Sequence, residues 1–367
     1  MARQHISWWN IEIGEAEQAA VREAIESKNI SQGPVTRSFE KRVSEYLGVQ
    51  HVIAVSNGSA VILSSLIANG IGVGDEVLLP DRTWIATAHA VHLLGARCVF
   101  VDVERERPVI DVELLKKCIT SKSKAIIAVH LNGRSANMAT INNIGQERGL
   151  VVIEDAAQAL GSRNSTGFLG TQSEIGCFSL SMAKIVASGQ GGLVVTNSDA
   201  LNLRLRNIRT HGVENVKDVT TWGAMGFNFR LTDIQAAIAS VQLSKIEKKI
   251  KRCKEIYKMY REGLTGLEGL QLIPVDIESG EVPIYNEWRC DRRDTLSQYL
   301  EQNGVETRPF YPSMHQARYF PDQSGLFPNS TRFSKEGLYL PSGPDQSLSS
   351  VEQVVSLIQD GAMQGKW

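Results

Sequence analysis

The chain has 367 residues, of which 42% are hydrophobic and 7% aromatic, as is ordinary for a globular protein. Its 39 Lys and Arg nearly cancel its 40 Asp and Glu, which argues against a nucleic-acid-binding protein and a polybasic membrane-surface protein. The five cysteines show no CxxC spacing, and no stretch approaches the roughly 18 consecutive apolar residues of a membrane-spanning helix. Because the N-terminus also lacks the apolar core of a signal peptide, we expect a cytoplasmic protein with free thiols and no membrane contact.

The first fifty residues predict an arm followed by two helices. Trp8 and Trp9 lie in a short apolar segment, and we interpret them as packing or interface residues. Apolar residues then recur with helical spacing over 14–28 and 35–47, with a Ser-Gln-Gly-Pro turn between the two stretches.

From residue 51 onward, strands and helices alternate. Short apolar runs predict strands at 51–55, 76–79, 98–103, 125–131 and 151–153. Helical patterns between them cover 60–69, 83–94, 111–120 and 138–148. This alternation is typical of a mostly parallel sheet covered by helices on both faces, in which ligands bind at the carboxyl ends of the strands.

The second half of the chain predicts a smaller domain. Strands are expected at 178–181 and 193–196, and a long helix at 231–264 then leaves the first domain. Beyond about residue 266 we expect a second α/β unit, which gives two domains, 1–240 and 241–367. Its expected elements are strands at 270–274, 287–290 and 305–308 and helices at 293–303 and 349–360.

An acid and a lysine suggest the chemistry. The apolar run 151–153 ends in Glu154 and Asp155, and because side chains alternate along a strand only one of the two should face a ligand. Lys184 follows about thirty residues later among small and apolar neighbours, whose desolvation would lower the pKa of its amine. Such a pair is what a pyridoxal phosphate enzyme needs, although a helix-capping acid and a solvated lysine are the simpler interpretations.

Three other patterns carry little weight on their own. The glycines at 70–74 follow a helix and precede a strand, which is the wrong order for a dinucleotide-binding loop. His89 and His92 share one helix, but no carboxylate or cysteine completes a metal site, so we predict no metal. The Gly58-Ser59 turn between a strand and a helix is by itself only a weak anion-binding signal.

Taken together, the motifs resemble those of the DegT/DnrJ/EryC1/StrS sugar aminotransferases, which have the aspartate aminotransferase-like fold of type I pyridoxal phosphate enzymes. The stretches that carry the resemblance are 31–34 (SQGP), 55–60 (VSNGSA), 72–77 (GVGDEV), 80–88, 100–103 (FVDV), 130–134 (HLNGR), 154–159 (EDAAQA), 176–184 (GCFSLSMAK), 189–192 (GQGG), 211–212, 226–233 (GFNFRLTD) and 308–315. The resemblance implies an α/β fold with a mixed, mostly parallel central sheet sandwiched by helices, followed by a smaller C-terminal α/β domain.

The resemblance also implies residue roles. Lys184 would form the Schiff base with pyridoxal 5'-phosphate, and Asp155 rather than Glu154 would pair with its pyridine nitrogen. The other implied cofactor contacts are the phosphate-binding Gly58, Ser59 and Ser179, the ring-stacking Trp84, Gln158 at the phenolic oxygen, and Asn228 reaching the phosphate from the second subunit of a homodimer. The resemblance also implies, less specifically, a substrate-binding role for Arg230, Arg308, Tyr311 and His315.

The implied reaction is transfer of an amino group from L-glutamate to a keto-sugar, most simply a nucleotide-linked 4-keto-6-deoxy sugar, for amino-sugar and surface polysaccharide biosynthesis. The lysine loop departs from relatives, which usually have His or Phe and Pro where this chain has 180–183 (LSMA). An oxidised sugar acid such as an 8-oxo-octulosonate is therefore the alternative substrate. A sugar dehydratase would have His in place of Lys184, and a non-catalytic regulatory member is the third alternative.

Overall fold

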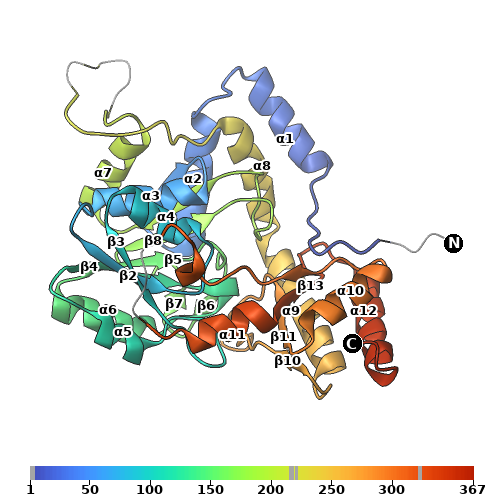
Figure 1. Cartoon of the computed structure of the whole chain (residues 1–367). Coiled ribbons are helices and arrows are strands. Elements are labelled where there is room, and N and C mark those ends of the chain that lie inside the picture. The colour runs from blue at the N-terminus through green and yellow to red at the C-terminus, as the bar shows by residue number, and fades with distance from the viewer. Residues whose placement is uncertain (1–4, 215–218, 220–221, 321–324) are drawn as a thin grey trace.

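A computed structural model describes residues 5–214, 219, 222–320 and 325–367, and its centre is a seven-stranded sheet (Figure 1). In spatial order the strands are β1 (His51–Val55), β9 (Gly192–Thr196), β8 (Ile175–Ser179), β5 (Val151–Asp155), β4 (Ser123–Val129), β2 (Glu76–Pro80) and β3 (Arg97–Val101). The neighbours from β8 to β3 run parallel, whereas β9 is antiparallel to both β8 and β1. The expected mixed, mostly parallel sheet is therefore confirmed.

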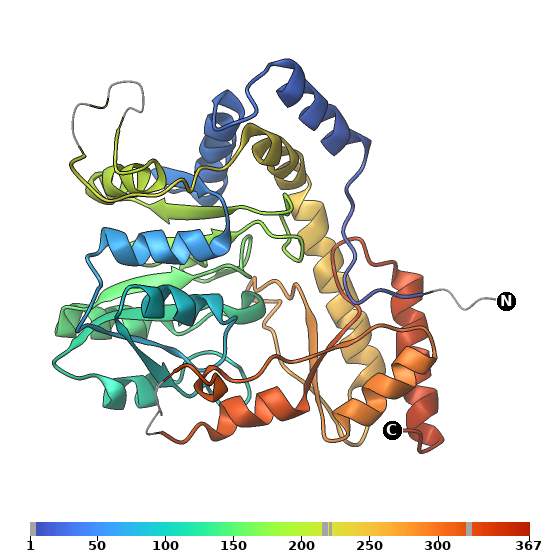
Figure 2. The same cartoon turned by 45° about the horizontal axis from the view of Figure 1, so that its top comes forward.

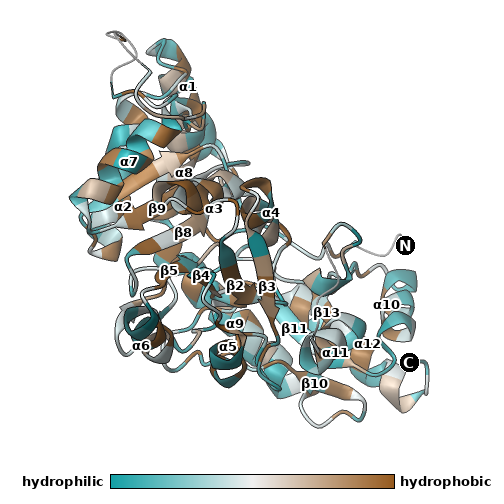
Figure 3. Cartoon of the chain, turned by 60° about the vertical axis from the view of Figure 1, so that its left-hand side comes forward, coloured by the Kyte–Doolittle hydropathy of each residue, from teal (hydrophilic) through white to brown (hydrophobic). Residues whose placement is uncertain are grey.

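Helices cover this sheet because its strands are apolar on both sides. β2 and β8 are buried along their whole length, and the strands are mostly brown in Figure 3, while the outer helices show more teal. A strand that is apolar on both faces needs cover on both faces. The helices of this part are α1 (Glu15–Glu26), α2 (Pro34–Leu47), α3 (Gly58–Ala68), α4 (Ala86–Leu93), α5 (Val112–Cys118), α6 (Met138–Arg148), α7 (Asp199–Arg209) and α8 (Asp233–Ser244), with the short η1 (Leu131–Gly133) and the hairpin β6 (Arg163–Asn164) and β7 (Gly167–Phe168).

The C-terminal part has its own antiparallel sheet of four strands. Their order is β10 (Leu270–Leu272), β11 (Asn286–Cys290), β13 (Gly337–Leu340) and β12 (Arg308–Pro309). The accompanying helices are α9 (Ile246–Leu264), α10 (Arg293–Gln302), η2 (Met314–Gln316), α11 (Pro328–Glu336) and α12 (Leu348–Met363). Because each sheet uses strands from one side of residue 240 only, we propose the division into domains 1–240 and 241–367.

The N-terminal segment lies against this C-terminal part. Ile6 forms a parallel bridge with Val305, and Trp9 forms one with Ser342. Figure 2 shows the blue N-terminal segment running down from α1 beside the red C-terminal helix. Residues 6–9 and residues more than 290 positions later therefore share one surface of the molecule.

Several sequence predictions need correction. The predicted helix at 231–264 is two helices, because Lys245 departs from helical geometry (φ −99°, ψ 4°) between α8 and α9. The predicted strand at 305–308 is reduced to the two-residue β12 and the single bridge at Val305. The elements α7, α11 and β13 were not expected. Within the described residues, no helix is both long enough and apolar enough to cross a membrane.

Candidate active site

A cavity of about 790 Å³ lies at the carboxyl ends of the parallel strands, between the two sheets. Most of the residues that the sequence singled out line this one cavity. They are Gly58, Ser59, Trp84, Asp155, Gln158, Ser179, Lys184, Arg308 and Tyr311. The wall also includes Trp8, Asn57, Thr87, Tyr285 and Tyr339, which come from both parts of the chain.

Asp155 ends β5 and faces the cavity. Its side chain is 3% exposed and accepts hydrogen bonds from the Thr87 hydroxyl (2.8 Å) and the Ala157 amide (3.1 Å). Burial raises the pKa of this carboxyl, and the bond from Thr87 opposes that rise only in part. A buried carboxylate beside an open cavity is a suitable partner for a protonated ring nitrogen. The positive charge on the nitrogen would offset the loss of water around the carboxylate.

Glu154 points away from the cavity and is satisfied by the protein itself. Its carboxylate accepts bonds from the backbone amides of Gly170 (2.7 Å), Gln172 (2.7 Å) and Ser173 (2.6 Å). His130 Nε2 lies 2.9 Å from the same carboxylate. Because His130 Nδ1 accepts from the Ala136 amide, Nε2 carries the proton and donates to Glu154.

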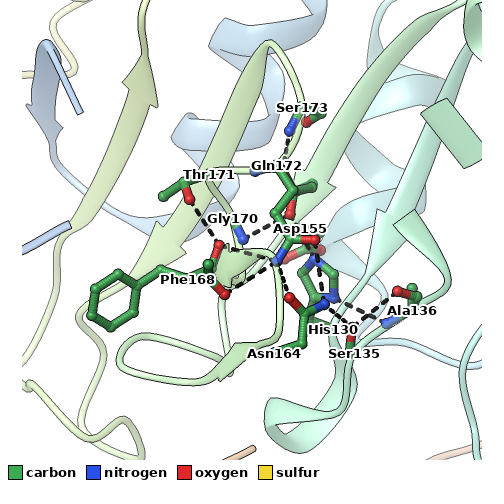
Figure 4. A network of polar contacts seen from close by, with 12 residues as sticks. His130, Ser135, Ala136, Asp155, Asn164, Phe168, Gly170, Thr171, Gln172 and Ser173 are labelled. Carbon is green, nitrogen blue, oxygen red and sulfur yellow. Dashed lines mark hydrogen bonds and ion pairs between the residues drawn. The ribbon is translucent and has the colours of Figure 1, made fainter. Parts of the chain in front are cut away.

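Figure 4 shows this network around the end of β5, with His130 and Ala136 on one side and the 168–173 turn on the other. Burial alone would raise the pKa of Glu154, but the bonds from His130 and the backbone outweigh it and lower the pKa. The alternation along β5 therefore separates an internal anchor, Glu154, from a cavity-facing acid, Asp155. Of the two acids that the sequence pattern left open, Asp155 is the one that lines the cavity.

Lys184 lies in the connection between the antiparallel strands β8 and β9. The loop is closed at its base by bonds from the Leu180 amide to Gly191 O (2.9 Å) and from the Ser188 amide to Leu180 O (2.9 Å). Desolvation lowers the pKa of the Lys184 amine to about 8, although the nearby Asp155 carboxylate acts in the opposite direction. An amine with this pKa is partly neutral near physiological pH and can act as a nucleophile.

One end of the cavity is suited to a phosphate group. It is formed by the first turn of α3, where the Asn57 side chain accepts from the Ala60 amide (2.8 Å) and caps the helix. The amides at a helix N-terminus point toward an anion, and the hydroxyls of Ser59 and Ser179 line the same end. A Cβ atom on Gly58 would come 3.1 Å from the side chain of Ser179, so glycine keeps this end open.

The remaining predicted contacts divide into two groups. Trp84 is 59% exposed at the cavity and packs edge-on against Tyr311, with ring centroids 5.7 Å apart. Arg308 lies at the mouth, where its guanidinium is 5.5 Å from the Trp8 ring and bonds to Glu306 (2.7 Å). Of the residues outside the cavity, His315 bonds through Nδ1 to buried Asp81 (2.6 Å).

Asn228 and Arg230 also lie outside the cavity of their own chain. Asn228 is exposed, and its side chain accepts from Arg230 Nε at 2.9 Å. The strip that carries them is joined to the end of β1 by the bridge between Arg230 and Val55. Their predicted roles, in which Asn228 reaches a second subunit, remain predictions.

Three cavity residues were missed or given another role by the sequence analysis. Thr87 bonds to Asp155 across 68 positions of the chain, and no local pattern indicates such a contact. Tyr285 was given no role in the sequence analysis. Trp8 was assigned to packing, whereas it also lines the cavity, and two adjacent tryptophans in the N-terminal segment were the available signal.

The cavity therefore offers what pyridoxal phosphate requires, namely an amine, an acid, a helix N-terminus with hydroxyls and aromatic walls. Residues 11–359 match the DegT/DnrJ/EryC1/StrS aminotransferase family. The chain belongs to this family. Like other members, it is a pyridoxal phosphate-dependent aminotransferase.

Solved structures of similar proteins agree with this assignment. DesV from S. venezuelae, in complex with a ketimine intermediate, is 30% identical with a TM-score of 0.90, and the match covers 94% of each chain. The aminotransferase TlmJ from Streptoalloteichus hindustanus is 30% identical with a TM-score of 0.92, over 98% of this chain and 100% of that one. DesI, analysed in the presence of its TDP-sugar product, is 26% identical with a TM-score of 0.89, over 100% of this chain and 95% of that one.

Proposed function

We propose that the enzyme transfers the amino group of L-glutamate to the ketone of a nucleotide-linked 4-keto-6-deoxy sugar. The observation that carries this proposal is the placement of Lys184 and Asp155 on one cavity whose mouth holds Arg308. The similarity to DesI, whose structure was analysed with a TDP-sugar product, favours a nucleotide-linked acceptor. Arg308 is placed to meet a phosphate or carboxylate of the acceptor, because a guanidinium pairs well with such groups.

Each residue has a defined task in this proposal. When bound, pyridoxal phosphate supplies the carbonyl that accepts the amino group and the ring that withdraws electrons from the reacting carbon. Asp155 holds the positive charge on the ring nitrogen. Lys184, with a pKa of about 8, takes the proton from the substrate carbon that bears the amino group and passes it to the cofactor.

The cofactor-binding residues complete the assignment. Gly58, Ser59 and Ser179 bind the phosphate at the N-terminus of α3. Gln158 donates from its amide to the phenolic oxygen, and Trp84 covers the ring. The part of the cavity lined by Trp8 and Arg308 is left for the sugar acceptor.

The strip around Asn228 supports a homodimer with shared active sites. Trp222 and Met225 precede it and are 75% and 67% exposed, and large exposed apolar side chains close together are typical of contact surfaces. Asn228 would then serve the phosphate site of the partner, with Arg230 supporting it. We also propose a cytoplasmic location, because all five cysteines are free thiols.

Replacing Lys184 with Ala tests the central assignment. We expect the purified variant to lose the visible absorbance of lysine-bound cofactor and at least about 1000-fold in amino transfer from glutamate. Lys254→Ala is the matched control, because the Lys254 amine donates to a backbone carbonyl (Ile277 O, 2.8 Å) and lies outside the cavity. A Lys184→Ala protein with normal turnover would show that another residue carries the chemistry.

The acceptor is identified by a panel of keto compounds. The enzyme is first converted to its amino form with glutamate, and the return of its visible absorbance is then followed with each compound. A nucleotide-linked 4-keto-6-deoxy sugar should react fastest, ahead of a nucleotide-linked 3-keto sugar. Fastest reaction with a nucleotide-free oxidised sugar acid would replace the nucleotide sugar in the proposal and leave amino transfer intact.

A further inference from the structure

Tyr285 contacts both the backbone and the amine of the reactive lysine loop. It precedes β11, lines the cavity and is 6% exposed. Its hydroxyl donates to the carbonyl oxygen of Ala183 at 2.7 Å, immediately before Lys184. Its ring centroid lies 6.0 Å from Lys184 Nζ. Tyr285 thus reaches the loop between β8 and β9 from the C-terminal part of the chain.

The Tyr285 hydroxyl is a permanent donor. Burial raises the pKa of this phenol well above its ordinary value, so the proton stays on the oxygen at any working pH. A carbonyl oxygen can only accept, which makes the direction of the bond to Ala183 unambiguous. The lysine loop is therefore held by a bond that does not titrate.

Asn132 holds Tyr285 in turn. Asn132 Oδ1 accepts from the Tyr285 amide (2.7 Å), and Asn132 Nδ2 donates to the Tyr285 carbonyl (2.9 Å), so both backbone groups are bound by one buried side chain. Asn132 adopts φ 54° and ψ 38°, a left-handed conformation that asparagine and glycine tolerate better than other residues.

The same asparagine orients a predicted cofactor contact. The Asn132 backbone amide donates to Gln158 Oε1 at 2.9 Å. Because the oxygen of Gln158 is bound in this way, its amide nitrogen is the end presented to a ligand in the cavity. An unbroken series of hydrogen bonds thus runs from Gln158 through Asn132 and Tyr285 to the carbonyl beside Lys184.

We propose that Tyr285 is a positioning residue which, held by Asn132, fixes the Lys184 amine at a constant place opposite Gln158. The proposal rests on the assignment of Lys184 as the cofactor-binding lysine. It differs from a simple packing role, which the Tyr285 ring also has through its stacked contact with Trp8 at 6.1 Å.

Loss of the hydroxyl should change the environment of the lysine. Asp155 from β5 and the Tyr285 ring from the C-terminal part face the amine, and both favour its charged form, while desolvation favours its neutral form. A loop released from Tyr285 admits water to the amine. The Lys184 pKa should then rise from about 8 toward its ordinary value of 10.5.

The experiment follows cofactor capture by cofactor-free protein. Pyridoxal phosphate is added to wild type and Tyr285→Phe, and the appearance of visible absorbance is timed across a range of pH. We expect Tyr285→Phe to be about tenfold slower near pH 8, with its half-maximal rate at higher pH and the difference vanishing in strong base. Tyr285→Leu, which also loses the ring, should be slower still at high pH.

Tyr260→Phe is the matched control. Tyr260 is 0% exposed and its hydroxyl also donates to a backbone carbonyl, that of Pro341 at 3.1 Å, but it lies in the C-terminal core away from the cavity. It should lose similar thermal stability and keep the wild-type pH profile of capture. Asn132→Gly, which tolerates the left-handed backbone but loses both bonds to Tyr285, should shift the profile in the same direction as Tyr285→Phe.

An unshifted profile for Tyr285→Phe, or one shifted equally in Tyr260→Phe, overturns the positioning role. Lys184→Ala separates this outcome from failure of the underlying assignment. If Lys184→Ala captures the cofactor normally, the assignment of Lys184 is wrong. If only Lys184→Ala fails to capture, the assignment stands and the role of Tyr285 falls.

Discussion

Glu154 and Asp155 are consecutive carboxylates on one strand with opposite environments. Glu154 meets four hydrogen-bond donors from the protein, whereas Asp155 meets the Thr87 hydroxyl and one amide beside an open cavity. The first pKa is lowered and the second raised. The comparison teaches that burial alone does not single out a candidate functional acid. The acid proposed for the chemistry, Asp155, is the one that the protein leaves incompletely paired.

The largest expected effect comes from Asp155→Asn. An amide cannot hold a positive charge on the cofactor ring, so we expect amino transfer from glutamate to fall by about 1000-fold. Circular dichroism of the cofactor-free protein should stay close to wild type, and its melting temperature should not fall. An Asp155→Asn enzyme within tenfold of wild-type activity would contradict the assigned role of Asp155.

Glu154→Gln should produce the reverse pattern. The neutral amide cannot satisfy His130 and three backbone amides together, so we expect the free energy of unfolding to fall by about 3 kcal/mol. Activity per folded molecule should change by less than about threefold, since Glu154 does not face the cavity. Urea denaturation measures the first quantity, and activity normalised to bound cofactor measures the second. A catalytic loss as large as that of Asp155→Asn would remove the distinction between the two acids.

The smallest expected effect concerns the stability of the cofactor-free protein. Its dependence on pH should have opposite signs for the contributions of Glu154 and Asp155. A lowered folded-state pKa means that Glu154 contributes stability that is complete above its ordinary value of 4.5 and is lost as pH falls. A raised pKa means that ionised, buried Asp155 costs stability, and this cost disappears as pH falls toward 3.8.

At neutral pH, Glu154→Gln should therefore be less stable than wild type and Asp155→Asn more stable. Both differences should shrink as pH is lowered. Urea midpoints measured from neutral pH down to about pH 4 check both slopes. Slopes of the same sign at the two positions would show that their environments do not differ as described.

Much of the fold could be predicted because the sheet is built from local patterns. β1, β5 and α6 lie within two residues of the expected bounds. The missed α7 also carried a local signal, since Ser198 caps a helix with apolar residues at Leu201, Leu205 and Ile208. The break at Lys245 had no such signal, because the apolar spacing of the sequence continues across it.

The site divides in the same way. Lys184, Asp155 and Gly58 lie in motifs, and each motif is short enough to read along the chain. The contacts that tune them are not local: Thr87 meets Asp155, and Tyr285 meets Ala183 from 102 positions away. Which of two adjacent acids would be internally satisfied depended on the 168–173 turn, and nothing in that turn's sequence indicates that it donates to Glu154.

The placement of β1 has a consequence for how the protein is made. β1 is the first strand of the central sheet to leave the ribosome, yet its partner strand is β9, with which Val55 pairs through Gly192. At the end of β1, Val55 forms a bridge with Arg230, and the amide of the next residue, Ser56, donates to Phe229 O. Until β9 has been synthesised, β1 therefore has no partner strand beside the proposed phosphate-binding turn. The proposed cofactor site forms only after most of residues 1–240 have been synthesised.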